Sequence, residues 1–388
     1  MLDNNMASMI HNEMRKHGIK LVLGYTVEGF KEKDNGVEVL LKDNPSLQAD
    51  MVVLAIGVTP DTVLAKEAGL ELGIKESIVV NDRMETSVPD IYAAGDAVQV
   101  KHYVTGNDAL ISLAGPANKQ GRIIADNICG GDSRYLGSQG SSVIKVFDMT
   151  AATTGINETN AKKSGLEVDT VILSPMSHAG YYPGGKVMTM KVVFEKESYR
   201  LLGAQIIGYE GVDKRIDVLA TAIHAGLNAT QLKDLDLAYA PPYSSAKDPV
   251  NMAGFMIDNI AKGTLKQWHL EDMDKISKDK DVVLLDVRTV GEFSMGHIDG
   301  FKNIPVDELR ERISEIEKGK PVYLICQSGL RSYIASRILE GNGYETYNFS
   351  GGFRFYDAVV NDRALIERAY ACGMESVSYT HLRAHETL

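Results

Sequence analysis

The chain of 388 residues has few cysteines, no excess of positive charge and no long apolar run. Its three cysteines, Cys129, Cys326 and Cys372, form neither a paired disulfide framework nor a metal-ligand cluster. A reducing cytoplasm is therefore the expected setting. The sequence has 41 Lys and Arg against 52 Asp and Glu, a net charge of −11. This acidic balance argues against nucleic acid or an anionic membrane as a partner.

The sequence also lacks a membrane segment. It contains no apolar run of the roughly 18 residues that a spanning helix needs. The opening Met-Leu-Asp-Asn-Asn-Met has neither the basic start nor the apolar stretch of a signal peptide. We expect a soluble protein of two to four domains, because single hydrophobic cores stop growing near about 250 to 300 residues.

The most informative segment that is present surrounds Cys326. Residues 322–325 are typical of a short buried strand, the thiol follows at once, and a tight loop leads into a helix over 333–339. A helix N-terminus, the loop amides and the cation of Arg331 all favour the thiolate, which is the nucleophilic form of cysteine. Gly329 supplies the positive φ that such a loop needs. The alternative is a cysteine that only packs at a strand end.

Further segments match one known family in the same order along the chain. They are residues 282–288, 292–293, 296–298 and 347–353. Together with the cysteine loop they resemble a rhodanese domain over about 266–360. The six-residue loop from Cys326 to Arg331 resembles family members that handle sulfane sulfur. The resemblance implies that Cys326 takes up a sulfur atom as a persulfide and passes it to a thiol acceptor.

The N-terminal part of the chain alternates between helix and strand patterns. We expect an amphipathic helix over 7–18 and strands over 19–23, 37–41 and 51–56. The last of these is a nearly unbroken apolar run. Continuous apolar strands are usually covered on both faces, as in α/β sheets.

Two turns in this part resemble the FAD-dependent pyridine nucleotide-disulfide oxidoreductases. The turn at Gly57, after the apolar run, resembles the end of the family's nicotinamide-nucleotide domain. The segment 86–97 carries Gly95 and Asp96 in a second turn. In the family this aspartate accepts a hydrogen bond from a ribityl hydroxyl of FAD, and the glycine lets the backbone approach the ligand closely.

A helix start after these turns carries the same resemblance. Leu113, Ala114 and Ala117 lie in its first turn, and Pro116 suits that position. The helix is expected to continue to about Ile128. In the family such a helix start faces the N1/O2 edge of the flavin, where its positive dipole end stabilises the anionic reduced flavin.

Residues 141–262 have a strand-rich pattern that resembles the dimerisation domain of the same family. We expect strands over 187–194 and 201–208 and a helix over 215–225. The closing segment 237–252 resembles the branch that contains coenzyme A disulfide reductase, NADH oxidase and NADH peroxidase.

Two tyrosines of this part are candidate catalytic residues. Tyr181 and Tyr239 match two tyrosines of the family's disulfide reductases. In those enzymes the two tyrosines reach across the dimer toward the partner's substrate sulfur. A phenol both donates and accepts hydrogen bonds, which suits an attacking or leaving thiolate. The alternative is that either tyrosine only packs at the dimer interface.

Three elements of a complete family member are missing from the sequence. They are a Gly-x-Gly-x-x-Gly turn for the FAD pyrophosphate, a redox cysteine and a second such turn for NAD(P)H. Cys129 does not fit the redox position and is expected to be structural. We therefore expect an N-terminally truncated reductase that binds FAD and NAD(P)H poorly and keeps only its sulfurtransferase half.

The expected fold class is multidomain, with α/β and α+β parts. The expected domains are the C-terminal part of an NAD(P)H-binding domain (1–85), the C-terminal part of an FAD-binding domain (86–140), an α/β dimerisation domain (141–262), a rhodanese α/β domain (266–373) and an unstructured tail that resembles a sequencing-adaptor scar (374–388). No metal site is expected, because His381 and His385 in the tail have no third ligand nearby.

The leading interpretation is an FAD-dependent NAD(P)H:CoA-disulfide or persulfide (polysulfide) oxidoreductase coupled to a rhodanese sulfurtransferase. Its cofactors would be FAD and NAD(P)H, with coenzyme A as substrate or ligand. It would act as a homodimer on sulfane sulfur or a CoA disulfide. One alternative is an NADH oxidase or peroxidase. An alternative of another class is a rhodanese module that senses sulfide or docks a partner without turnover.

Overall fold

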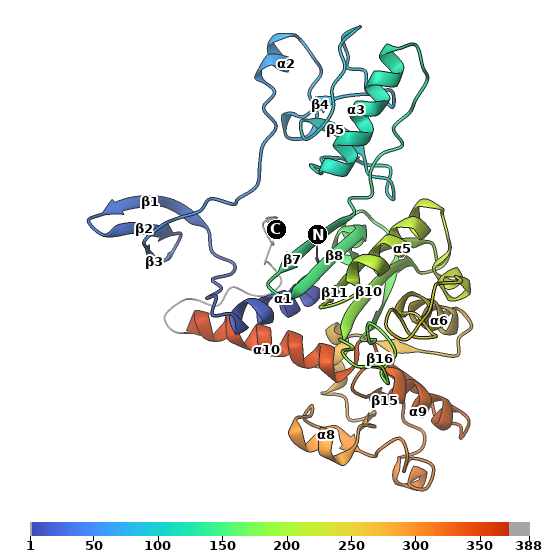
Figure 1. Ribbon diagram of the computed structural model, residues 1–388. Coiled ribbons are helices and arrows are strands. Elements are labelled where there is room, and N and C mark those ends of the chain that lie inside the picture. Colours follow the sequence, from blue (N-terminus) through green and yellow to red (C-terminus); the bar gives the residue numbers. More distant parts are fainter. Residues whose placement is uncertain (1, 372–388) are drawn as a thin grey trace. The chain divides into compact units, whose positions relative to one another are not determined.

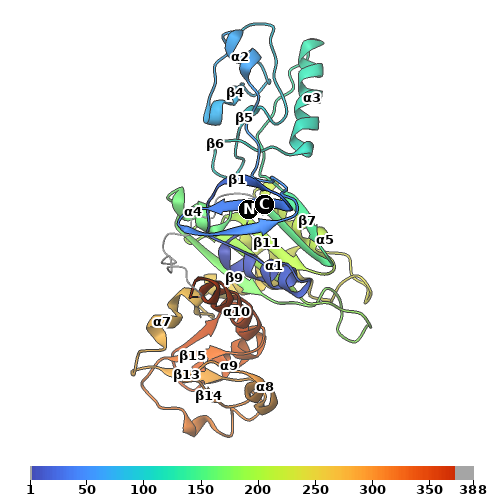
Figure 2. The same ribbon diagram turned by 90° about the vertical axis from the view of Figure 1, so that its left-hand side faces the viewer.

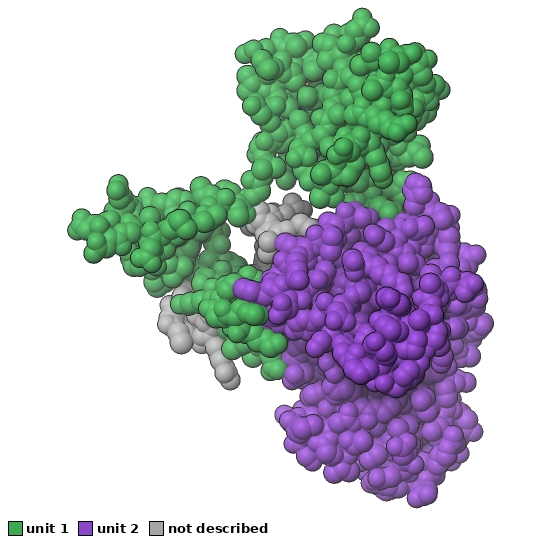
Figure 3. All heavy atoms as spheres, viewed as in Figure 1, with its two compact units in different colours: residues 1, 14–140, 361–388 green, residues 2–13, 141–360 purple. Residues whose placement is uncertain are grey.

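The computed structural model describes residues 2–371 (Figure 1). Cys372 and the expected tail lie outside the described residues. The chain forms two compact units (Figure 3). Of the described residues, unit 1 holds 14–140 and 361–371, and unit 2 holds 2–13 and 141–360. Among the described helices, none combines the length and the apolar character that crossing a bilayer requires.

Unit 1 contains two small sheets and a long helix. One sheet has the antiparallel order β1-β2-β3 and the other the order β4-β5-β6. Met84, Val98 and Val100 form a small buried core, against which Ile123 and Ile124 of α3 pack. The elements are β1 (Val27–Lys33), β2 (Gly36–Leu41), β3 (Asn44–Ala49), α2 (Val63–Glu67), η1 (Ile74–Glu76), β4 (Ile78–Val79), β5 (Val98–Lys101), β6 (Asp108–Ala109) and α3 (Ala114–Ile128).

Two strands that the sequence predicts in this unit do not form. Residues 19–23 and 51–56 belong to no strand or helix, and the side chains of Met51 and Ile56 are 75% and 78% exposed. A strand exists only where a neighbour takes up its N–H and C=O groups. Within the described residues no strand pairs with either segment. The expectation that 51–56 is covered on both faces is therefore wrong.

The first sheet of unit 2 is antiparallel, with the order β7-β8-β11-β10-β9. Its strands β10 and β11 are almost wholly buried, and α5 packs on β8 and β11. The elements are α1 (Asn4–Lys16), β7 (Ser142–Val146), β8 (Met149–Gly155), α4 (Glu158–Lys163), β9 (Val168–Leu173), β10 (Met188–Glu195), β11 (Leu201–Gly208), α5 (Val212–His224), η2 (Ala229–Asp234) and α6 (Pro249–Ala261).

A buried ionic cluster joins the start of the chain to this sheet. The Lys191 ammonium has no exposed surface and lies 2.9 Å from an Asp3 carboxylate oxygen and 2.6 Å from a Glu158 oxygen. Burial alone would raise the pKa of Asp3, but the charge of Lys191 and hydrogen bonds from Lys191 and Thr159 lower it to about 2. Asp3 is therefore ionised at neutral pH.

The second sheet of unit 2 is parallel, with the order β12-β16-β15-β13-β14. Helix α9 packs on β15 and β16, and Figure 2 shows it beside β15. The elements are β12 (Gln267–Trp268), η3 (Leu270–Asp272), α7 (Met273–Ile276), β13 (Val283–Asp286), α8 (Val290–Met295), β14 (Lys302–Asn303), η4 (Ile313–Glu315), β15 (Val322–Ile325), α9 (Leu330–Glu340), β16 (Thr346–Phe349) and α10 (Gly352–Ala371).

The parallel direction of these strands gathers functional groups at one edge. Cys326 directly follows β15, Arg288 follows β13 and Ser350 follows β16. The carboxyl ends of parallel strands meet at the same edge of a sheet, which is where α/β proteins place their sites.

Candidate functional site

The sulfur of Cys326 is held by hydrogen-bond donors. The Gly329 amide donates to Sγ at 3.1 Å, and the Ser332 hydroxyl donates to it at 3.2 Å. Cys326 has no exposed surface and also borders the apolar core of the parallel sheet. The sulfur is thus not held by apolar packing alone. Because it is covered, a sulfur donor can reach it only when part of this cover moves.

The cysteine loop is fixed from both sides by the starts of two helices. Gly329 is the N-cap of α9 and has φ 96°, a conformation that favours glycine. At the start of α10, the Phe353 amide donates to the Cys326 carbonyl at 2.8 Å. A Cβ on Gly352 would lie 2.7 Å from the Ser328 nitrogen, so only glycine allows α10 to begin this close to the loop.

The charged group of Arg331 forms an ion pair with Glu292. Its guanidinium makes two hydrogen bonds of 2.7 Å to the Glu292 carboxylate. These bonds from Arg331 lower the pKa of Glu292 to about 2, so both groups are charged at neutral pH. The cation expected beside Cys326 is therefore largely compensated by Glu292.

A buried ion pair ties the end of β13 to the start of α10. The Arg288 guanidinium donates to the Asp286 carboxylate at 2.7 Å, and both side chains are almost fully buried. The same guanidinium lies 3.8 Å from the centre of the Phe353 ring. This pair supports the framework from which α10 reaches the cysteine loop.

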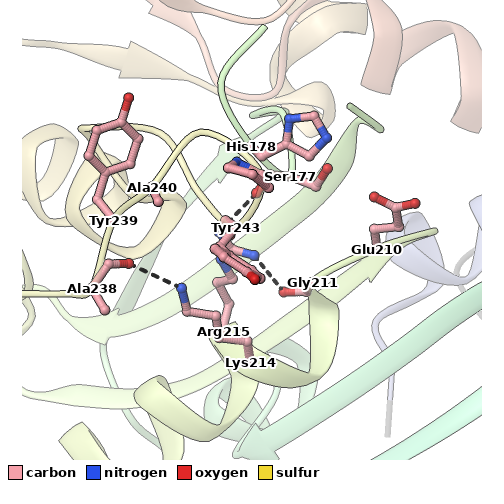
Figure 4. Close-up of a pocket in the computed structure, with 11 residues that line it drawn as sticks. Ser177, His178, Glu210, Gly211, Lys214, Arg215, Ala238, Tyr239, Ala240 and Tyr243 are labelled. Carbon is pink, nitrogen blue, oxygen red and sulfur yellow. Dashed lines mark hydrogen bonds between the residues drawn. The ribbon is translucent and has the colours of Figure 1, made fainter. Parts of the chain in front are cut away.

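Tyr181 and Tyr239 contact each other within one chain. Their hydroxyl oxygens are 2.5 Å apart, and the residues are 76% and 45% exposed. The hydrogen bond to Tyr181 raises the pKa of Tyr239. A cavity of about 490 Å³ opens beside Tyr239, with Lys214 and Tyr243 also in its lining (Figure 4). The structure thus brings the two predicted tyrosines together, at the surface of unit 2.

Arg215 lies under this cavity and was not identified from the sequence. Its guanidinium is buried and donates to the Ser177 carbonyl at 2.9 Å (Figure 4). It also donates to the Ser244 hydroxyl at 3.1 Å and the Asp248 carboxylate at 3.0 Å. It therefore joins the segments that carry both tyrosines. One signal was available, because Arg215 occupies the face of α5 that also buries Leu219.

In unit 1 a hydrogen bond joins the turn at Gly95 to α3, the helix whose start carries other predicted flavin-binding residues. Gly95 has φ 86°, and its amide donates to the Gln120 side chain of α3 at 2.7 Å. A Cβ on Gly95 would meet nothing within 4 Å, and Asp96 beside it is exposed. The turn therefore faces open space next to α3.

The start of α3 has no side-chain cap. Its N-cap is Leu113, an apolar residue whose side chain cannot accept a hydrogen bond from the first amides of the helix. The Ala117 amide already donates to the Leu113 carbonyl at 3.2 Å. The uncapped amides at this helix start and the open space beside Gly95 suit a polar ligand, and the flavin-binding role of these residues remains a prediction. The sequence offers no Gly-x-Gly-x-x-Gly turn for the pyrophosphate.

Gly57 is not joined to this group. It has φ 89° and is exposed in the segment that forms no strand. No hydrogen bond among the described residues links it to Gly95 or to α3. Its expected role in binding a nucleotide remains a prediction.

Three family models match the chain in succession. The model described as pyridine nucleotide-disulphide oxidoreductase matches residues 1–121. The dimerisation domain of the pyridine nucleotide-disulphide oxidoreductases matches residues 141–249, and the rhodanese-like domain matches residues 269–358. The mixed α/β multidomain fold agrees with this series of domains.

Several of the similar curated proteins are named as sulfur or coenzyme A reductases. The chain is 36% identical over 248 residues to an NAD(P)H sulfur oxidoreductase (CoA-dependent) of Pyrococcus abyssi, a match that covers 64% of the chain and 55% of the relative. It is 33% identical over 256 residues to a coenzyme A disulfide reductase of Staphylococcus aureus, covering 66% of the chain and 57% of the relative.

Two solved structures match nearly the whole chain. The crystal structure of reduced Bacillus anthracis CoADR-RHD has a TM-score of 0.90 and 46% identity, covering 93% of this chain and 65% of that one. An NAD-dependent persulfide reductase from A. fulgidus has a TM-score of 0.84 and 40% identity, covering 92% of this chain and 65% of that one.

These matches correct one expectation from the sequence. The chain spans a little over half the length of the curated relatives, 55% and 57% in the two above. Even so, both oxidoreductase models match it. The expectation that only the sulfurtransferase half is kept is therefore not supported, and the comparisons give no support to the expected truncation.

Proposed function

Because the chain belongs to the pyridine nucleotide-disulphide oxidoreductases and carries a rhodanese-like domain, we propose that it serves NAD(P)H-dependent reduction of coenzyme A disulfides or persulfides. In this proposal Cys326 is the residue that transfers sulfane sulfur. The observation that carries the proposal is that the Cys326 sulfur, at the carboxyl end of β15, accepts hydrogen bonds from the Gly329 amide and the Ser332 hydroxyl. The names of the relatives support the same chemistry.

Sulfur transfer at Cys326 takes two displacement steps. The thiolate attacks the outer sulfur of a donor such as thiosulfate, a new S–S bond forms, and the donor's S–S bond breaks with its electron pair leaving on sulfite. An acceptor thiolate then attacks the outer sulfur of the Cys326 persulfide. The electron pair of that S–S bond returns to Sγ, and the thiolate is regenerated. The hydrogen-bond donors of the loop stabilise the charge that Sγ carries at the start and end of the cycle.

The oxidoreductase part of the proposal uses residues of both units. The Gly95 and Asp96 turn and the start of α3 would hold the ribityl and ring parts of FAD. Bound flavin supplies the redox chemistry between NAD(P)H and a sulfur substrate. Tyr181 and Tyr239 would bind and orient the substrate sulfur through their hydroxyl groups. The protein would act as a homodimer, which the match to the dimerisation domain supports.

The sulfurtransferase step is tested by transfer from thiosulfate to cyanide, followed as thiocyanate. We expect Cys326→Ser to reduce the rate to background, because a serine hydroxyl stays protonated at neutral pH and is a poor nucleophile toward sulfur. Cys129→Ser is the matched control, since that cysteine is exposed and lies outside the site. Retained activity in Cys326→Ser would refute the role of Cys326, whereas a parent protein that transfers no sulfur would favour the docking module.

An NADH oxidase is the second candidate, because one relative carries that name. This protein of Methanocaldococcus jannaschii is 34% identical over 252 residues, covering 65% of the chain and 56% of the relative. The two candidates differ in the electron acceptor. Measuring NADH consumption with oxygen alone, and then with a coenzyme A disulfide in the absence of oxygen, separates them.

A further inference from the structure

We propose that Ser332 is a catalytic residue whose hydroxyl follows the charge on the Cys326 sulfur, and that Asn348 makes this movement possible. The inference rests on the proposed function and deepens it. Ser332 lies in the first turn of α9, and Asn348 lies on β16. Both meet at the Gly329 carbonyl beside the cysteine.

The Ser332 hydroxyl has two acceptors and one proton. Its oxygen lies 3.2 Å from Cys326 Sγ and 3.1 Å from the Gly329 carbonyl oxygen. A hydroxyl donates only one hydrogen bond at a time, so it must choose between them. Neither Ser332 nor Cys326 has exposed surface, so solvent does not supply a substitute donor. The choice therefore decides how much donor stabilisation the sulfur receives.

Asn348 keeps the carbonyl satisfied when the hydroxyl turns away. Its side-chain amide donates to the Gly329 oxygen at 3.1 Å, and the residue is 3% exposed. The Tyr333 amide also donates to this oxygen at 3.1 Å. A buried carbonyl that lost its only donor would be costly, but this one retains two. Rotation of the Ser332 hydroxyl from the Gly329 oxygen to the Cys326 sulfur therefore costs little free energy.

The sulfur changes its charge during transfer, which gives the rotation a direction. The thiolate is an ionised acceptor and makes the stronger hydrogen bond, so the hydroxyl points to Sγ. After sulfur uptake the charge lies on the outer sulfur, and Sγ becomes a neutral, weak acceptor. The hydroxyl then favours the Gly329 carbonyl. When the acceptor thiolate removes the outer sulfur, the electron pair returns to Sγ and the hydroxyl stabilises it as the leaving group.

The test measures the pH dependence of Cys326 alkylation by iodoacetamide, with the modified peptide identified by mass. We expect Ser332→Ala to move the midpoint of this profile up by about one pH unit, which is about a tenfold loss of thiolate at a given pH below it. Ser332→Thr keeps the hydroxyl and is expected to keep the midpoint near that of the parent protein.

The matched control is Ser336→Ala. Ser336 is also buried on α9, one turn later, but its hydroxyl donates to the Tyr333 carbonyl at 2.7 Å. It should leave the midpoint unchanged. A merely structural role for Ser332 would lower the melting temperature without moving the midpoint, and an unmoved midpoint in Ser332→Ala would overturn the proposal.

Asn348→Ala tests the second half of the inference. Without this donor the Gly329 carbonyl would keep only the Tyr333 amide when the Ser332 hydroxyl turns to the sulfur. The hydroxyl then favours the carbonyl more than in the parent protein, so the midpoint should rise although Ser332 is intact. Ser332→Ala with Asn348→Ala should add little to Ser332→Ala alone, because the two residues act on the same bond. Additive shifts would refute the coupling. If Cys326→Ser still transferred sulfur, the proposed function would fail. If it were inactive while Ser332→Ala titrated like the parent, only this inference would fail.

Discussion

Glu292 pairs with Arg331 beside the cysteine loop, and the hydrogen bonds from Arg331 lower the pKa of Glu292 to about 2. A depressed folded pKa means that the pair stabilises the protein above the unfolded value of about 4.3 and loses this effect as the pH falls toward 2. We expect the melting temperature of Glu292→Gln to lie below that of the parent at pH 7, and the gap to close between pH of about 4.5 and 2. Thermal unfolding over this range measures it, with Glu311→Gln as an exposed control. A gap that does not change with pH would contradict the assignment.

Single residues were predictable where the signal is local. Cys326 lies in the loop between β15 and α9 and Arg331 lies in the first turn of α9, and the sequence predicts this succession of strand, loop and helix. Ser332 is adjacent to Arg331, but the direction of its hydroxyl is set only by the folded first turn of α9. Asn348 comes from another strand and meets Gly329 through the parallel sheet. Pattern analysis of one segment contains no information on such contacts.

At the scale of elements, an apolar run predicts a strand only when the fold supplies a neighbour. The segments 201–208 and 51–56 are both rich in apolar residues. The first forms β11, which pairs with β10 and β8 and is buried along its whole length. The second has no pairing strand among the described residues and stays exposed. Composition thus reports a preference for burial, and hydrogen-bond partners decide whether it is met.

Helix α5 depends on a buried charge that can be tested directly. Arg215 is 1% exposed and pairs with Asp248, which is 3% exposed. Arg215→Met would leave the carboxylate buried without its cation. We expect the free energy of unfolding to fall by about 3 to 5 kcal/mol, measured by chemical denaturation. Lys214→Met on the same helix is the matched control and should change it by about 0.5 kcal/mol or less. Equal effects of the two substitutions would show that Arg215 is not an anchor.

At the scale of the whole molecule, polar contacts inside unit 2 join its antiparallel and parallel sheets. The Gln267 side-chain amide donates to the Thr170 carbonyl at 2.8 Å, and the Ile172 backbone amide donates to the Ser350 hydroxyl at 3.0 Å. Ser350 stands two residues before Gly352, where α10 begins against the cysteine loop. The antiparallel sheet therefore holds the segment that positions Cys326. These partners lie about 100 or more residues apart, which explains why the sequence did not reveal them.

The pair of His269 and Asp169 makes this junction sensitive to pH. The His269 Nε2 lies 3.1 Å from an Asp169 oxygen. Burial works to lower the pKa of His269, but the hydrogen bond and charge of Asp169, together with the charges of Glu271 and Glu158, raise it above its usual value. The raised pKa means that this stabilisation is complete below the unfolded value of about 6.5 and is lost as the pH rises through the folded value.

We therefore expect His269→Ala to lower the melting temperature most at pH of about 6 or below, with a gap to the parent protein that shrinks at higher pH. Differential scanning calorimetry from pH 5.5 to 9 measures this. Asp169→Asn should reproduce the loss, and the double variant should add little, because both substitutions remove the same contact. Loss of the contact should also let the two sheets of unit 2 unfold in less closely coupled transitions. A gap that stays constant over this range would mean that His269 contributes by packing and not by its charge.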